Sequence, residues 1–207
     1  VSLTLSISSL MMLFINAVGI IMFPILKRTD EKKLPEIYAI MRDALMLVLL
    51  GSLIIYFPLK SILVIWLPQY TESLKYMALL FPMCVYEGKM ALLVNTYLKA
   101  LRKERLMLKI NIISLSVSFI LSIITTMVIR NLNLSIALIV VVLAFRCVIA
   151  EMFLSKELKL SMTKDIILEL IMTVVFILAG WFLHSWLMVF LYAVAYAVYC
   201  ILKRKDI

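Results

Sequence analysis

The chain has 207 residues, of which 65% are hydrophobic and 16% charged, and its formal net charge is +9. Its mean hydropathy of +1.12 excludes an ordinary water-soluble domain, because a domain of this size cannot remove so much apolar side chain from water. The apolar residues come in long blocks rather than in short alternating segments, which also excludes a transmembrane barrel. The composition therefore predicts an all-α integral membrane protein.

The apolar blocks are roughly 18 to 26 residues long, enough for a helix to cross about 30 Å of hydrocarbon. We expect seven spans, at residues 2–26, 43–66, 74–99, 108–129, 134–155, 165–183 and 186–203. Only LHSW (183–186) separates the last two, which form either two crossings or one re-entrant pair. Trp181 and Trp186 beside this turn suit a membrane interface.

Basic residues gather in alternate connections between the expected spans, at 27–42, 99–109, 156–164 and 203–205. Loops rich in Lys and Arg stay on the cytoplasmic side, so we expect the C-terminus inside and residue 1 outside. This arrangement suggests the C-terminal part of a longer chain, whose N-terminal half is then a partner. The positive charge is a topology signal, and no nucleic acid is expected to bind LRKER (101–105).

Among the charged residues of the expected spans, three lie deep in the membrane. Glu87 and Lys89 lie in 74–99 and Arg146 lies in 134–155, all near the middle of the membrane by helix rise. Charges at that depth cost at least a few kcal/mol each, so they should face protein or water and have partners. Glu87 and Lys89 point about 200° apart around a helix, so each needs its own partner, and a Glu87–Arg146 ion pair is one candidate.

Three interpretations of these charges remain open. They clamp helices together, with the Lys89 side chain extending toward the cytoplasm; or Lys89 and Arg146 bind an anion such as a diphosphate in a central cavity. In the third, Glu87 takes part in proton or sodium coupling.

Small polar residues recur at helical spacing in span 108–129. Ser114, Ser118 and Ser122 share one helix face, where hydroxyl groups allow close helix packing and bonds across the contact. This stripe is either a packing face or the polar wall of a cavity, and we assign Asn95, in the preceding span, to the same alternatives. Catalytic residues, a metal site and a cofactor are not expected, because the three cysteines and single histidine show no ligand or catalytic spacing.

Four segments carry a resemblance to a known family: FPILKRTDEKK (23–33), IWLPQYTESLKYMALLFP (65–82), NTYLKALRKERLMLKINI (95–112) and AFRCVIAEMFLSK (144–156). The first has a proline and a basic pair before a charged loop, and the second has a turn containing tyrosine between two spans. The third has a basic run followed by an asparagine, and the fourth has a basic residue followed by an acidic one toward the end of a span. In these features the chain resembles the O-antigen and teichoic-type polysaccharide flippases of the multidrug/oligosaccharidyl-lipid/polysaccharide exporter superfamily. Two departures are a missing glycine in WLPQY and a missing glycine–alanine pair in NLNLSIALIV.

The resemblance implies the C-terminal portion of a two-lobed transporter with 12 to 14 spans. Residues 1–155 would then supply five helices of the second lobe, and 156–207 an appended helix pair with a basic cytoplasmic tail. Such proteins flip undecaprenyl-diphosphate-linked oligosaccharide across the bacterial cytoplasmic membrane by alternating access. Lys89 and Arg146 are carried over as cavity residues by position only.

Alternative functions are a drug or cation antiporter of the same superfamily, a helper subunit, and a membrane-embedded polysaccharide-assembly enzyme. Two midplane cations favour an anionic lipid carrier over a drug. The expected outer connections are short, which leaves little room for an enzyme's catalytic site.

Overall fold

The computed structural model describes residues 24, 26, 28–30, 33–66, 68–70, 76–129, 132–182 and 187–203. All regular structure in these ranges is helical, which confirms the all-α prediction there. The first expected span, 2–26, lies almost wholly outside them. The α-helices are α2 (Leu34–Ser52), α3 (Tyr56–Trp66), α5 (Met77–Leu80), α6 (Met83–Lys89), α7 (Asn95–Ala100), α8 (Glu104–Ile123), α9 (Leu132–Leu158), α10 (Thr163–Phe182) and α11 (Leu187–Lys203).

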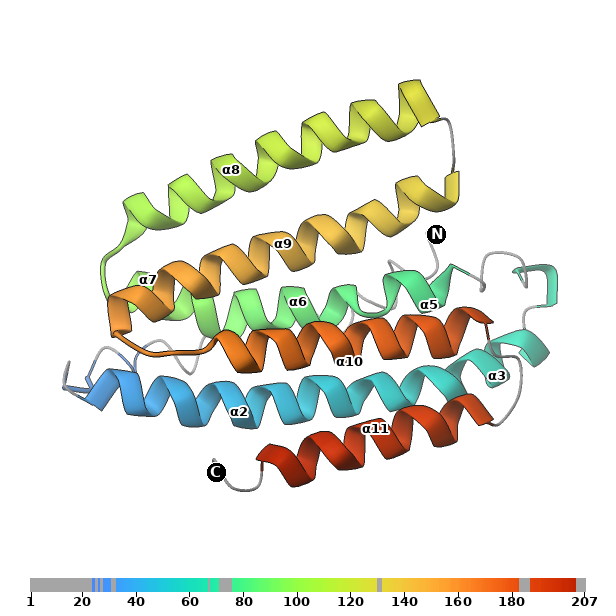
Figure 1. The fold of residues 1–207 in the computed structure, drawn as a ribbon, viewed down its shortest axis with the longest axis horizontal. Coiled ribbons are helices and arrows are strands. Elements are labelled where there is room, and N and C mark those ends of the chain that lie inside the picture. The colour runs from blue at the N-terminus through green and yellow to red at the C-terminus, as the bar shows by residue number, and fades with distance from the viewer. Residues whose placement is uncertain are drawn as a thin grey trace.

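Four continuous helical segments in the described part of the chain are long and apolar enough to cross a membrane: Leu34–Trp66, Met77–Ala100, Glu104–Met127 and Leu134–Leu158. They correspond to the second to fifth expected spans and identify a membrane-embedded protein. The helices α10 and α11 are separate and lie side by side in opposite directions (Figure 1).

The second span begins earlier than hydropathy predicts, at Leu34 rather than at residue 43. Pro35 stands in the first turn, where a missing N–H group costs no hydrogen bond, and Glu36 places a negative charge at the positive end of the helix dipole. The part of α2 before residue 43 is too polar to be predicted as membrane-spanning, although its backbone is helical.

Two of the long segments are interrupted in the middle. A 3-10 turn at Leu53–Ile55 joins α2 to α3. A turn at Phe81 and Pro82 separates α5 from α6, because proline has no N–H group to donate to the preceding turn. A π-helical turn at Met90–Val94 then joins α6 to α7 directly after Lys89.

The helices lie nearly side by side along the long axis of the molecule, with α8 at one edge and α11 at the other (Figure 1). The segment Met77–Ala100 is in the middle: 78% of its apolar window is buried, against 11% for Glu104–Met127 among the described residues. The helix α6 contacts both α2 and α9, whereas α8 contacts mainly α9. Residues on α6 are therefore the ones most enclosed by protein.

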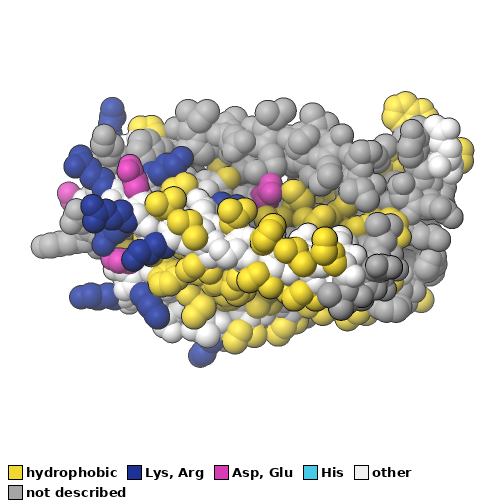
Figure 2. Space-filling model, turned by 90° about the horizontal axis from the view of Figure 1, so that it is seen from above, with side chains coloured by type: hydrophobic (Ala, Val, Ile, Leu, Met, Phe, Trp, Pro, Cys, Tyr) yellow, Lys and Arg dark blue, Asp and Glu magenta, His cyan; other side chains and the backbone are white. Residues whose placement is uncertain are grey.

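Basic side chains gather at one end of the molecule, on the left in Figure 2. In Figure 1 the same end holds the α7–α8 connection, the α9–α10 connection and the last turn of α11. The alternate basic clusters of the sequence thus meet at one end of the bundle.

An aromatic core joins α3, α10, α11 and the turn after α5 through the rings of Tyr56, Phe57, Phe81, Phe176 and Tyr192. Tyr56 packs edge-to-face on Phe176, with ring centroids 5.2 Å apart, and Phe176 packs likewise on Tyr192 at 5.3 Å. Such contacts stabilise a pair by about 0.5–1.5 kcal/mol beyond the burial of area. They hold α10 between α3 and α11.

Two side-chain hydrogen bonds join α11 to α2 along one face. The hydroxyl of Tyr192 donates to the Leu50 carbonyl at 2.8 Å, and that of Tyr196 donates to the Leu47 carbonyl at 2.9 Å. Both tyrosines and Lys203 fall on the same side of α11, because spacings of four and seven residues repeat on one helix face. This polar seam fixes how α11 is rotated against α2.

Gly180 marks a close approach of α10 to α5. A Cβ atom at this position would lie 2.8 Å from the Cβ atom of Ala78. We expect Gly180→Ala to lower the free energy of unfolding by about 1–3 kcal/mol, the usual cost of overpacking. The double variant Gly180→Ala/Ala78→Gly should recover most of the loss, as measured by thermal unfolding in lipid nanodiscs. Equal stability of all three proteins would contradict this close contact.

Candidate functional site

Lys89 lies at the centre of a buried ionic network. Its side chain is 2% exposed, and its Nζ atom is 2.5 Å from carboxylate oxygens of both Glu151 and Glu169. The guanidinium of Arg42, which is fully buried, bonds to the same two carboxylates through Nε and Nη2. Each glutamate thus uses one oxygen for Arg42 and the other for Lys89, and the four side chains form a closed ring that we call the ionic ring.

The ring connects four helices, because α2, α6, α9 and α10 supply one member each. By helix rise, Lys89 lies about 16 Å from the end of α7, whereas Glu151 and Glu169 lie about 10 Å and 9 Å from the corresponding ends of α9 and α10. The lysine side chain therefore extends toward the basic end of the bundle, as the clamp interpretation proposes.

A second group of charges lies next to the ring. The Nη1 atom of Arg42 is 3.3 Å from Asp43 and 3.4 Å from Asp165. Lys203, at the end of α11, lies 2.8 Å from Asp43 and 2.9 Å from Asp165. Arg42 belongs to both groups, since its planar guanidinium presents several donors in a fixed geometry.

The pairing explains why an apolar chain retains these charges. Moving an ion out of water costs several kcal/mol, which a good geometry with several bonds can offset. Each cation here contacts at least two carboxylates. Losing one member would leave its partners buried with less compensation, so the network holds the helices in one arrangement.

The sequence pointed to Lys89 but not to most of its partners. Arg42 was assigned to a cytoplasmic connection, since the expected span began one residue later. A spacing of four residues places Asp165 and Glu169 on one helix face, and this spacing was the sequence signal that could have identified them as members of a buried site.

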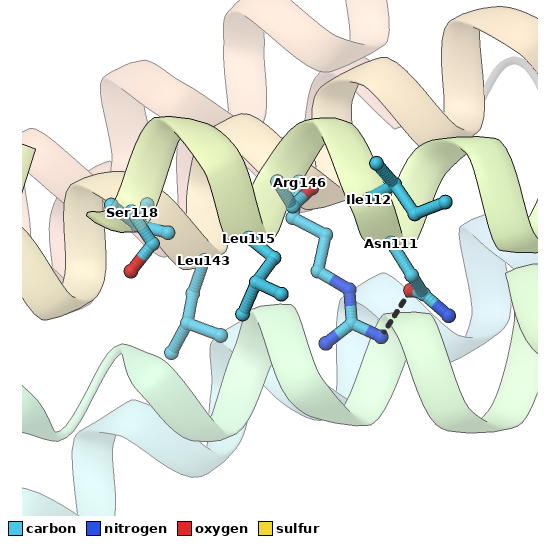
Figure 3. A pocket seen from close by; sticks show the side chains of 8 residues that line it. Asn111, Ile112, Leu115, Ser118, Leu143 and Arg146 are labelled. Carbon is cyan, nitrogen blue, oxygen red and sulfur yellow. Dashed lines mark hydrogen bonds between the residues drawn. The ribbon is translucent and has the colours of Figure 1, made fainter. Parts of the chain in front are cut away.

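A separate open groove of about 370 Å³ lies between α8 and α9. It is lined by Asn111, Ile112, Ser114, Leu115, Ser118, Val142, Leu143 and Arg146. Figure 3 shows the Arg146 side chain extending from α9 to Asn111 on α8, with Leu115 and Leu143 between this pair and Ser118. The groove is therefore apolar along most of its length and positively charged at Arg146.

The polar groups of the groove are only partly bonded. The Nη2 atom of Arg146 donates to Asn111 Oδ1 at 2.9 Å. The Nε atom of Arg146 and the Oγ atom of Ser114 are buried and have no hydrogen-bond partner within the described structure. A guanidinium with a spare donor beside a spare hydroxyl can bind an anionic or hydroxyl-bearing group.

The hypothesised Glu87–Arg146 ion pair is not present among the ion pairs of the described residues, because Arg146 bonds to Asn111 instead. Glu87 is half-buried on α6, close enough to Arg146 for the two charges to attract each other.

The remaining candidate residues are distributed differently. Ser114 and Ser118 line the groove, whereas Ser122 is exposed and its carbonyl accepts a bond from Thr126. Asn95 begins α7 after the π-helical turn, and its Oδ1 atom is buried with no partner in the described structure. Asn95 does not line the groove.

Comparisons of the chain with family models, curated proteins and solved structures found no match. Among the residues that the structure describes, no group of three or more His, Cys, Asp or Glu residues is placed to hold a metal ion. The described residues offer two electrostatic features: an ionic network on α2, α6, α9, α10 and α11, and a partly unsatisfied cation in the α8–α9 groove.

We expect Lys89→Met to lower the free energy of unfolding by about 3–5 kcal/mol, because it leaves two buried carboxylates with only Arg42 between them. Adding Glu169→Gln to Lys89→Met should lower the free energy of unfolding by less than Glu169→Gln lowers it in the wild type, since one of those carboxylates is then removed. Unfolding of the purified variants in nanodiscs measures both.

Lys103→Met is the matched control, because Lys103 forms an ion pair with Glu157 in which both side chains are over 40% exposed. Its loss should change stability by at most about 1 kcal/mol. Wild-type stability of Lys89→Met would show that the ring does not hold the helices.

Proposed function

We propose that the chain is part of a membrane transporter that flips a lipid-linked, negatively charged glycan by alternating access. The observation that carries this proposal is Arg146: a cation on a helix long enough to span the membrane, in an apolar groove, with a donor left unbonded. A charge kept at such a depth with no salt bridge among the described residues suggests that it meets an anion from outside the described structure.

The two candidate cations have different roles in this proposal. The ammonium of Lys89 contacts two carboxylates, so a substrate anion would have to displace both. Among the described residues, Arg146 bonds only a neutral amide and has a donor to spare. Arg146 is therefore the proposed substrate cation, and Lys89 positions helices.

The groove has the chemistry of an amphipathic ligand. An undecaprenyl-diphosphate-linked oligosaccharide combines an anionic diphosphate, sugar hydroxyl groups and a long apolar chain. Arg146 suits the diphosphate, because guanidinium groups bind phosphate through paired donors. Ser114, Ser118 and Asn111 suit hydroxyl groups, and Leu115 and Leu143 suit the apolar chain.

The setting of this function is proposed on the same basis. The basic end of the bundle would face the cytoplasm, with the C-terminus inside a bacterial cytoplasmic membrane, because basic clusters favour that side. The N-terminal half of the same transporter and the membrane lipids would be the partners. The chain would need no cofactor, and a proton or sodium gradient would drive it.

A drug or cation antiporter is the second candidate within the same class. A cationic substrate needs a carboxylate or aromatic surface, yet the residues lining the groove include one arginine and no acid. This observation favours the anionic ligand.

We expect Arg146→Ala to weaken substrate binding about tenfold to a hundredfold, since a hydrogen bond to a charged group contributes about 1.5–3 kcal/mol. The protein should still fold, because Arg146 forms no salt bridge within the described structure and Glu87, the carboxylate that it attracts, is only half-buried. Binding of a fluorescent polyprenyl-diphosphate disaccharide to the purified chain measures the first effect, and export of surface polysaccharide in cells measures its consequence. Arg146→Lys should retain part of the binding, as it keeps the charge.

Lys60→Met is the control, since Lys60, like Arg146, is a basic residue on an apolar helix, but it lies over the ring of Tyr56 on α3. It should bind the probe as the wild type does. Unchanged binding and export in Arg146→Ala would contradict the proposed role of the groove.

A further inference from the structure

The ionic network holds more acids than bases. The acids are Asp43, Glu151, Asp165 and Glu169, and the bases are Arg42, Lys89 and Lys203. Fully ionised, the described members carry three positive and four negative charges, a net charge of −1. The ring alone is neutral, so the excess lies in the outer group formed by Asp43, Asp165 and Lys203.

Burial makes this excess costly. Every member except Asp165 has a side chain that is at most 8% exposed, and Asp165 is 22% exposed. A net charge among apolar helices lacks the solvation that water would give, and a buried group commonly becomes neutral rather than remain charged. One bound proton removes the excess without requiring space for an ion.

Two buried hydroxyl groups beside the network have no partner, which is an independent observation. The phenol oxygens of Tyr38 on α2 and Tyr199 on α11 make no hydrogen bond within the described structure. Tyr38 interacts electrostatically with Glu151 and Arg42, and Tyr199 with Asp43, Asp165 and Glu169. Unpartnered buried hydroxyls are uncommon. A protonated carboxyl has an O–H group that needs an acceptor, and a phenol oxygen can accept.

Among the described residues, the other ionisable groups near the network do not supply the missing positive charge. The thiol of Cys147 on α9 lies near Lys89, and Tyr86 on α6 lies near Glu169. The Tyr86 hydroxyl is already bonded to Thr173 at 3.0 Å. Neither group carries a positive charge in any protonation state that it adopts in proteins.

We propose that the ionic network is a proton-binding site that shares one exchangeable proton among its four carboxylates. The proton enters from water at the basic end, where Asp165 is the most exposed member, and forms an O–H bond with a carboxylate oxygen. The network then changes from a charge of −1 to neutrality. This site is distinct from the groove of Arg146 and does not rest on the proposed transport function.

Infrared spectroscopy of the purified full chain in nanodiscs tests the proposal, because a protonated carboxyl has its own carbonyl band, which shifts in D₂O. At neutral pH, where exposed carboxyl groups are ionised, we expect the wild type to retain this band at roughly one proton per chain, shared by coupled groups. Asp165→Asn makes acids and bases equal in number and should abolish the band. Lys203→Met increases the excess of acids and should enlarge it.

Glu157→Gln is the control, because Glu157 forms the exposed pair with Lys103, and it should leave the band unchanged. Absence of the band from the wild type would overturn the proposal. A band that stays the same in both Asp165→Asn and Lys203→Met would also overturn it, by placing the proton outside the network. These spectra are independent of substrate binding, so they can succeed or fail separately from the tests on Arg146.

Discussion

The bonding of two buried glutamates by the same arginine and lysine is the interaction on which the rest of the structure depends. In an apolar bundle, a buried charge is stable only where opposite charges and hydrogen bonds meet it. Arg42, Lys89, Glu151 and Glu169 come from four helices whose other contacts are mainly apolar and non-directional. Their bonds fix the rotation and depth of α2, α6, α9 and α10 together, which side-chain burial alone specifies weakly.

The cations within this bundle differ in how far the protein itself satisfies them. The ring uses both oxygens of each glutamate and leaves Lys89 enclosed. Within the described structure, Arg146 donates to one neutral amide and keeps a buried donor unbonded. A satisfied charge stabilises a structure, whereas an unsatisfied one in a groove is available to a ligand. This contrast separates a structural lysine from a candidate binding arginine, although both stand out in the sequence for the same reason.

Apolar length predicted the four long helices, because crossing hydrocarbon requires about 20 apolar residues whatever their partners are. It missed the first turns of α2, where Pro35 and Glu36 favour a helix without being apolar. The depth of Lys89 also predicted that it needs a partner. The identity of that partner was beyond sequence reasoning, since Glu151 and Glu169 are 62 and 80 residues away and meet Lys89 only through the packing of three helices. For the same reason, the sequence made Glu87 a reasonable partner for Arg146, but the packing of α8 against α9 brings Asn111 to Arg146 instead.

Solid-state NMR of the full chain in lipid bilayers tests the ionic ring most directly, by measuring dipolar coupling between the side-chain nitrogen of Lys89 and glutamate carboxyl carbons. The account predicts strong coupling to both Glu151 and Glu169, whose oxygens lie 2.5 Å from that nitrogen. It also predicts no contact between this nitrogen and lipid phosphate or mobile water. Coupling to phosphate or water, without coupling to either carboxyl carbon, would contradict the ionic ring. Lys89 would then be a candidate substrate-binding residue.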